Sequence, residues 1–147
     1  MLTSVLIYTN TFLFLILSGL HFYWLSGGTW GYNAAIPERF KASFFNPARR
    51  LKTRLSTFLV AIGLLAFASA SFLNLSDYQL LHERYPIRQV TIGIAFVFLL
   101  RAVGDFRYVG FFKKAGNDVF SRMDTALYSP LCLIFSINAF YMALWTC

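Results

Sequence analysis

The sequence predicts an all-α integral membrane protein, a bundle of four transmembrane helices that forms one domain over residues 1–147. Composition is the first observation behind this prediction. Hydrophobic residues make up 58% of the chain and charged residues 13%, about half the charge of a soluble domain. Patterning is the second, because the apolar residues lie in long blocks close to the roughly 20 residues that cross the hydrocarbon core of a bilayer.

Each block has recognisable ends. The four predicted helices cover residues 3–25, 47–76, 87–108 and 129–146. Asn46 as N-cap and Pro47 as first helical residue predict the start of the second helix, and Ser129 and Pro130 predict the start of the fourth in the same way. The uncharged core of the third helix is short, so Arg101 is expected inside that helix or near its end.

Basic residues predict the orientation of the bundle. The first connection carries six of them: Arg39, Lys41, Arg49, Arg50, Lys52 and Arg54. The third carries four: Arg107, Lys113, Lys114 and Arg122. The second carries only Arg84 and Arg88, and the tails carry none. Since Lys and Arg mark cytoplasmic loops, we expect both termini outside; this asymmetry also accounts for the net charge of +7 without a nucleic-acid partner.

Several kinds of chemistry find no support in the sequence. No carboxylate lies near the middle of a predicted span, which argues against a proton-coupled transporter. Two His and two Cys show no metal-ligand spacing, and no phosphate-binding glycine loop occurs, so neither a metal nor another cofactor is predicted. A bridge between Cys132 and Cys147 is excluded if the last helix is continuous, because about 22 Å would separate them.

One group of polar residues is a candidate site at the cytoplasmic end. Topology places His21, Arg101 and Asp105 at similar depth, and Asp105 and Tyr108 share a face with Arg101 if the third helix continues. A carboxylate at a helix C-terminus is unfavourable, so a tertiary partner or a ligand explains it better than helix stability. The alternative is that Arg101 reaches lipid phosphate while Asp105 neutralises nearby basic residues. The candidate ligand-binding residues are His21, Trp24, Trp30, Arg101, Asp105 and Tyr108.

The connections between the helices also carry features that can be interpreted. The glycine- and aromatic-rich stretch 26–37 is either a lid over a pocket or an interfacial loop that packs on the membrane. Phe111 and Phe112, followed by Lys113, are typical of an interfacial anchor. Asp118 and Asp124 are expected to bracket a short helix. The basic loops together are suited to hold anionic lipid head groups, with or without a specific site.

The same stretches carry a resemblance to a known family. They are His21–Trp24, Gly27-Gly28, Trp30-Gly31, Ala35–Pro37, Leu100–Gly110, Asp124 and Leu127–Leu131. Together they resemble an uncharacterised family of small bacterial membrane proteins, domain of unknown function 3995, over nearly the whole chain. The resemblance implies a bacterial plasma-membrane protein with four helices and implies no activity. A fainter likeness to membrane sterol-isomerase-type bundles concerns architecture only.

Three functional hypotheses remain open from the sequence. The first is a membrane protein that binds a lipid or other amphipathic molecule in a polar pocket on the cytoplasmic side. The second is an accessory subunit that packs against a larger membrane complex or against copies of itself. The third is an enzyme that acts on a membrane-soluble substrate. A cavity lined by Trp30, His21, Arg101 and Asp105 would favour the first and third, and a tightly filled bundle the second.

Overall fold

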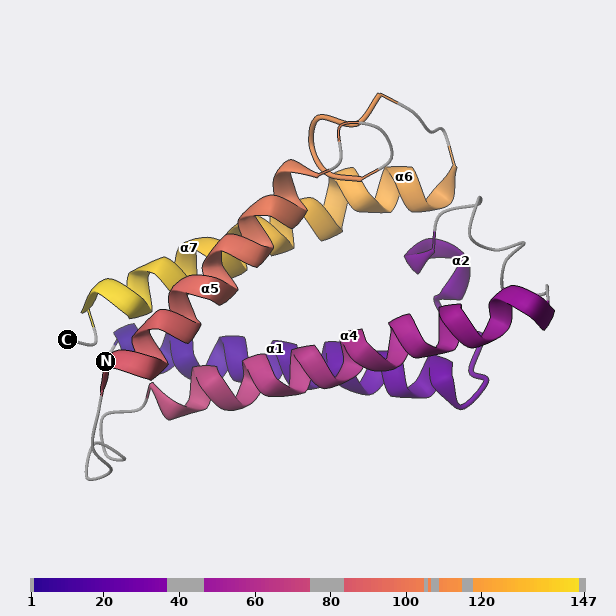
Figure 1. Cartoon of the computed structure of the whole chain (residues 1–147). Helices are drawn as coiled ribbons and strands as arrows, with labels where there is room; N and C mark the ends of the chain where they lie inside the picture. Colours follow the sequence, from indigo (N-terminus) through magenta and orange to yellow (C-terminus); the bar gives the residue numbers. More distant parts are fainter. Residues whose placement is uncertain are drawn as a thin grey trace.

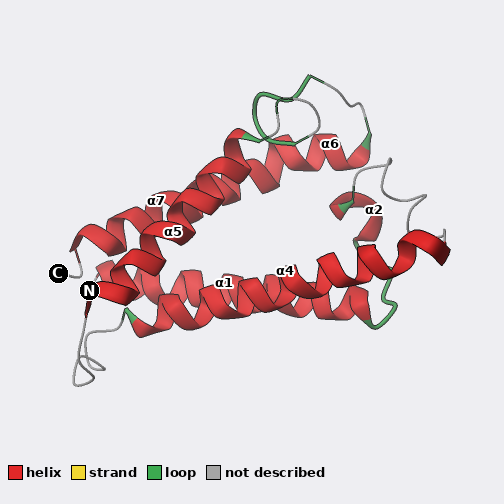
Figure 2. Cartoon of the chain, in the orientation of Figure 1, coloured by secondary structure: helices red, strands yellow, loops and turns green. Residues whose placement is uncertain are grey.

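Where it describes the chain, the computed structural model consists of helices and the loops that join them, without a strand (Figure 2). It describes residues 2–36, 47–74, 84–104, 106, 109–114 and 118–145. The elements are α1 (Leu2–Leu25), α2 (Tyr32–Ala35), α4 (Pro47–Leu73), α5 (Arg84–Val103), α6 (Val119–Met123), the π-helix η2 (Asp124–Tyr128) and α7 (Ser129–Trp145). The predicted all-α class is therefore confirmed for these residues.

The long helices form two antiparallel pairs. α1 lies along α4, and α5 lies along α7 (Figure 1). The pairs meet near the two chain termini and diverge toward the opposite end, where α2 lies between them and packs against α6 (Figure 1). The arrangement places the connections after α1 and after α5 at the same, diverging end.

Four phenylalanines, one from each long helix, hold the two pairs together. Phe14 of α1 packs against Phe98 of α5 and Phe135 of α7, with ring centroids 5.3 and 4.6 Å away. Phe67 of α4 lies 5.8 Å from Phe98 and 6.1 Å from Phe14. Phe14 and Phe135 are almost completely buried, at 0% and 1% exposure. Aromatic pairs at such distances add to the burial of apolar area, so this cluster is the centre of the core.

Polar side chains also join helices inside the bundle. The Ser18 hydroxyl on α1 donates to the Ala61 carbonyl on α4 at 2.8 Å. Asn138 Nδ2 on α7 donates to Asn10 Oδ1 on α1 at 3.2 Å. Such hydrogen bonds between helices are a usual means of association in lipid, where apolar contacts alone give little preference for protein over lipid.

The outer surface of the helices is apolar. Phe12 on α1, Leu59 on α4 and Leu144 on α7 are 63%, 61% and 63% exposed. Among the described residues, three helices are long and apolar enough to cross a membrane: Leu2–Leu25, Leu51–Leu73 and Val119–Leu144. The prediction of a membrane protein is confirmed at this level. α5 is not among the three, and its 20 residues include three arginines.

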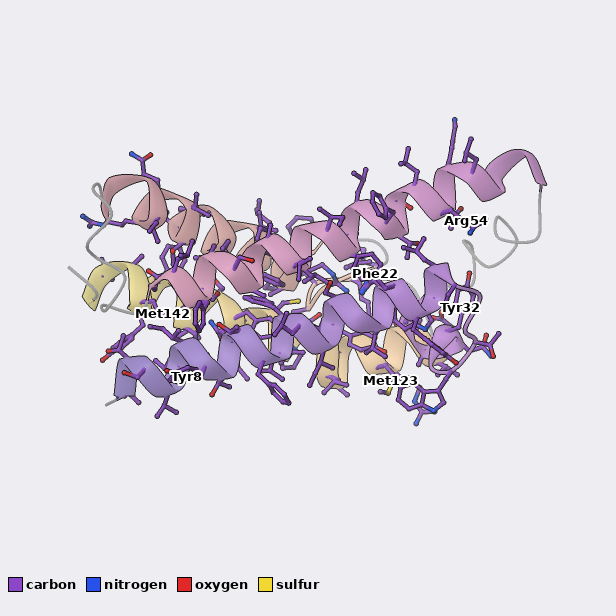
Figure 3. All side chains as sticks on the ribbon, turned by 90° about the horizontal axis from the view of Figure 1, so that it is seen from below. Tyr8, Phe22, Tyr32, Arg54, Met123 and Met142 are labelled. Carbon is purple, nitrogen blue, oxygen red and sulfur yellow. The ribbon has the colours of Figure 1, made fainter. Side chains whose placement is uncertain are left out.

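The two ends of the bundle differ in their side chains. Arg54, Tyr32 and Met123 lie at the diverging end, whereas Tyr8 and Met142 lie near the other end (Figure 3). Arg54 Nη2 lies 3.4 Å from the Leu25 carbonyl, so α4 donates to the last residue of α1 there.

The third helix ends earlier than predicted. It was expected over residues 87–108, but α5 ends at Val103 because Gly104 adopts a left-handed conformation, φ +84°, and donates its N–H to the Leu100 carbonyl at 2.8 Å. A left-handed glycine after the last helical residue is a common helix stop. α5, which contains Arg101, therefore ends before Asp105 and Tyr108, and these two residues lie outside the described residues.

The fourth helix begins earlier than predicted. α6, η2 and α7 follow one another without a break, and the backbone of Ser129 is helical, with φ −67° and ψ −45°. The prediction that Ser129 is an N-cap is wrong, because its N–H donates to the Asp124 carbonyl five residues earlier. Pro130 has no N–H and crowds the preceding turn, and the wider π turn lets the helix pass through it.

Candidate functional site

A buried carboxylate organises the diverging end of the α5–α7 pair. Asp124, at the start of η2, is 0% exposed. Its Oδ1 accepts a hydrogen bond from Arg101 Nη2 at 2.8 Å, and its Oδ2 accepts from Lys113 Nζ at 3.0 Å and from the Gly110 N–H at 2.8 Å. We call Asp124, Arg101, Lys113 and Gly110 the Asp124 centre. A carboxylate removed from water needs such charged donors to remain ionised.

The π-helix gives Asp124 its position. Asp118 precedes α6 as its N-cap and Asp124 follows it as the C-cap, so the prediction that these two residues bracket a short helix is confirmed. The chain then enters η2 instead of leaving the helix. Single π turns inside α-helices occur frequently at functional sites, because the extra residue displaces one side chain from the regular face. Here that turn begins at the residue that holds the two cations.

A tight loop brings Lys113 and the Gly110 amide to the same carboxylate. Gly104 and Gly110 both have positive φ, +84° and +93°. A Cβ on Gly104 would meet the Val109 carbonyl and Gly110 Cα, and one on Gly110 would meet the Gly104 backbone. The Phe111 N–H closes the loop by donating to the Ala102 carbonyl at 2.9 Å. We call this close approach of Gly104 and Gly110 the glycine clasp.

Counted over the described residues, the Asp124 centre carries one positive charge in excess. Arg101 and Lys113 contribute two charges against the one of Asp124. Lys113 also donates to Thr125 Oγ1 at 2.6 Å. The second terminal nitrogen of Arg101, Nη1, is buried and has no hydrogen-bond partner among the described residues, and the same holds for Ser129 Oγ. The centre therefore combines an excess cation with unused donors.

Aromatic residues at the end of α1 and in the turn after it pack against one another. We call this region the aromatic turn. Trp24 Nε1 donates to the Trp30 carbonyl at 2.9 Å, and the Trp30 N–H approaches the Tyr23 hydroxyl at 3.4 Å. The Tyr23 ring lies directly over Gly28, where a Cβ would collide with it. His21 Nδ1 lies 2.7 Å from the Leu17 carbonyl, to which the ring donates, and the His21 ring packs edge-on against Trp24 at 5.0 Å.

This turn continues into α2, which packs against α6. Trp30 is 72% exposed, whereas burial raises the pKa of Tyr32 to about 12. Tyr32 therefore stays protonated and neutral throughout the physiological pH range. Trp30 is thus mostly exposed, whereas the Tyr32 side chain is partly buried.

The predicted site residues fall into three groups. Arg101 lies in the Asp124 centre. His21 and Trp24 lie at the end of α1 and Trp30 lies in the turn that follows it. No hydrogen bond or ion pair within the described ranges joins them to Arg101. Asp105 and Tyr108 lie outside the described residues. Among the residues that are described, the structure therefore does not bring the predicted set together.

Sequence reasoning missed two of the three side chains of the centre, Asp124 and Lys113, and also the Gly110 amide. Asp124 and Lys113 were interpreted as a helix boundary and an interfacial anchor, and neither was connected to Arg101. One signal was present, because Asp124 is an acidic residue six positions before Pro130 at the head of an apolar block. Without the π turn, however, that block was expected to begin after Asp124. In 2–36, 47–74, 84–104 and the later described segments, no group of three or more His, Cys, Asp or Glu residues could hold a metal ion.

Comparison with known proteins assigns the chain to a family. Residues 14–139 match the family described as Protein of unknown function (DUF3995). The chain belongs to this family. The resemblance inferred from its motifs is thereby confirmed, and the matched region of this DUF3995 protein contains both the aromatic turn and the Asp124 centre. No curated protein and no solved structure matches the chain significantly.

Proposed function

We propose that this DUF3995 protein is a four-span protein of the bacterial plasma membrane that binds an anionic amphiphile through its phosphate-type head group at the Asp124 centre. The buried carboxylate with two cationic partners carries this proposal. An excess positive charge and an unpaired guanidinium nitrogen favour an anionic ligand. Phospholipids of the bilayer are the nearest molecules that carry an anionic group on long apolar tails.

The packing of α5 supports the fourth span. α5 lies antiparallel along α7, which belongs to an apolar helix long enough to cross a membrane (Figure 1). Its outward side chains are apolar, with Phe96 52%, Val97 51% and Leu100 68% exposed. The pairing of Arg101 with Asp124 reduces the cost of a cation near the end of a span. A helix that presents such side chains beside a membrane-crossing helix is best accommodated by lipid.

Loss of the Arg101 charge is expected to weaken head-group binding. We expect Arg101→Gln to retain roughly ten-fold less anionic phospholipid than the wild type, because a charge-assisted hydrogen bond contributes about 1.5–3 kcal/mol. Native mass spectrometry of the full chain, extracted gently and titrated with phosphatidylglycerol, measures this directly. Arg88→Gln is the matched control, since Arg88 lies in the same helix, α5, with an exposed side chain.

Four results would separate the possible outcomes of that titration. Arg101→Lys should recover much of the binding if charge is what matters, and it guards against a variant that simply misfolds. Stabilisation by inorganic phosphate alone, with none by phospholipid, would mean that the centre takes a free anion. Equal lipid retention in Arg101→Gln and Arg88→Gln would contradict the proposed site. A co-purifying protein in place of lipid would favour the accessory-subunit hypothesis.

The topology gives a second expected result. With four spans and cytoplasmic basic connections, both termini lie outside. A reporter that matures only in the cytoplasm should therefore stay dark when fused after Cys147, and one inserted in the connection before Pro47 should be bright. A bright C-terminal fusion would mean that α5 does not cross the membrane, because three spans place the two termini on opposite sides.

A further inference from the structure

The loop between α5 and α6 exposes aromatic side chains. Phe106, Phe111 and Phe112 are 59%, 42% and 62% exposed. The rings of Phe106 and Phe112 pack against each other, with centroids 6.1 Å apart. Two large apolar side chains that associate at the surface and remain mostly exposed leave a contiguous apolar patch that water solvates poorly.

The backbone is strained in a way that keeps Phe106 on the surface. Its φ is +58°, and Phe106 is the one non-glycine residue with positive φ in the described segments. A bulky L residue rarely adopts this conformation, and such strain persists where the surrounding structure fixes it. The glycine clasp and the hydrogen bond from Gly110 to Asp124 fix it here. The Phe106 side chain is thus 59% exposed at a strained backbone position.

The surroundings of the Phe106–Phe112 pair indicate what covers it. The described part of the loop lies beside α6 and not beyond its far end (Figure 1). Lys114 in the loop and Arg122 in α6 are exposed cations. Leu127 of η2 is a further exposed apolar residue, at 49%. Aromatic rings next to cations, at the end of a lipid-facing surface, match the interfacial layer of an anionic leaflet.

We propose that the Phe106–Phe112 pair inserts into the interfacial layer of the anionic leaflet and anchors this loop there. The rings occupy the boundary between head groups and acyl chains, while Lys114 and Arg122 contact lipid phosphates. This anchor is independent of the ligand at the Asp124 centre, because it uses the opposite, exposed side of the loop. It fixes the depth of the centre relative to the head groups.

Site-directed spin labelling tests the anchor in the full chain. A nitroxide is attached at Phe112→Cys in a Cys132→Ala, Cys147→Ser background, and the protein is placed in vesicles of phosphatidylcholine with phosphatidylglycerol. Oxygen partitions into lipid and a nickel chelate stays in water. We expect the ratio of oxygen to nickel accessibility at position 112 to be several-fold above that at Lys114→Cys, the matched loop control, and below that at Phe12→Cys, a lipid-facing reference.

Two outcomes would overturn the proposal. A ratio at position 112 equal to that at position 114 would place the pair in water. Strong dipolar coupling between labels at position 112 on different chains would mean that a second copy, and not lipid, covers the rings. Neither outcome would bear on lipid binding at Arg101, which the mass titration measures separately.

Discussion

Asp124→Ala is expected to lower the free energy of unfolding by about 3 kcal/mol or more, since removal of one partner of a buried ion pair typically costs about 3–5 kcal/mol. The substitution leaves Arg101 and Lys113 without their shared carboxylate and the Gly110 N–H without its acceptor. The lower end of the range applies because the Arg101 side chain is 34% exposed and retains some solvation. Equilibrium denaturation in detergent measures the change.

The control for this variant is Asp118, at the other end of α6. Asp118→Ala removes a half-buried carboxylate whose side chain makes no cap hydrogen bond, so it should change stability by only about 0.5 kcal/mol. A double-mutant cycle of Arg101→Ala and Asp124→Ala should also be non-additive, with the double variant less destabilised than the sum of the single ones. Additive effects, or equal effects of Asp118→Ala and Asp124→Ala, would show that the ion pair contributes little.

Gly104→Ala and Gly110→Ala are each expected to destabilise the protein by about 2–4 kcal/mol, the combined cost of a left-handed L residue and of overpacking. In both variants the new methyl group meets backbone atoms of the opposite strand of the glycine clasp, which cannot move away as a flexible side chain can. Opening the clasp would also withdraw the Gly110 N–H from Asp124. Thermal unfolding of the detergent-solubilised variants gives the measurement.

Glycines elsewhere in the bundle provide the comparison. Gly63 in α4 and Gly93 in α5 have open space around the position of a Cβ. Their replacement by alanine should be neutral or stabilising by up to about 1 kcal/mol, because alanine is the better helix former. The clasp would be disproved if Gly104→Ala behaved like Gly63→Ala.

The class of the protein could be predicted from local properties of the chain. Burial of an apolar block in lipid depends on its own length and composition, and the blocks at 3–25 and 47–76 match α1 and α4 to within a few residues. Gly104 is a residue at which a helix often ends, and the third helix does end before it. The prediction extended that helix to residue 108 all the same. The start of the fourth could not be found in this way, because Ser129-Pro130 is equally compatible with a helix start and with a π turn.

The candidate site was predictable only in part. Arg101 was identified because an arginine near the end of an apolar helix requires an explanation. Its partner was expected four residues away, at Asp105, since neighbours on one helix are all that a sequence pattern can pair. The carboxylate that the described structure pairs with it is 23 residues away, and Lys113 reaches Asp124 across a loop.

The sequence by itself determined that the chain folds in a lipid bilayer. Long apolar segments, low charge and clustered basic residues require a bilayer whatever the packing of the helices. Tertiary structure alone decided which charges meet. The left-handed Gly104 ends α5, the glycine clasp returns the chain, and the π turn before Pro130 directs Asp124 inward. An ion pair depends on distance in space. These three backbone features bring Arg101 and Asp124, which are 23 residues apart in the chain, to 2.8 Å.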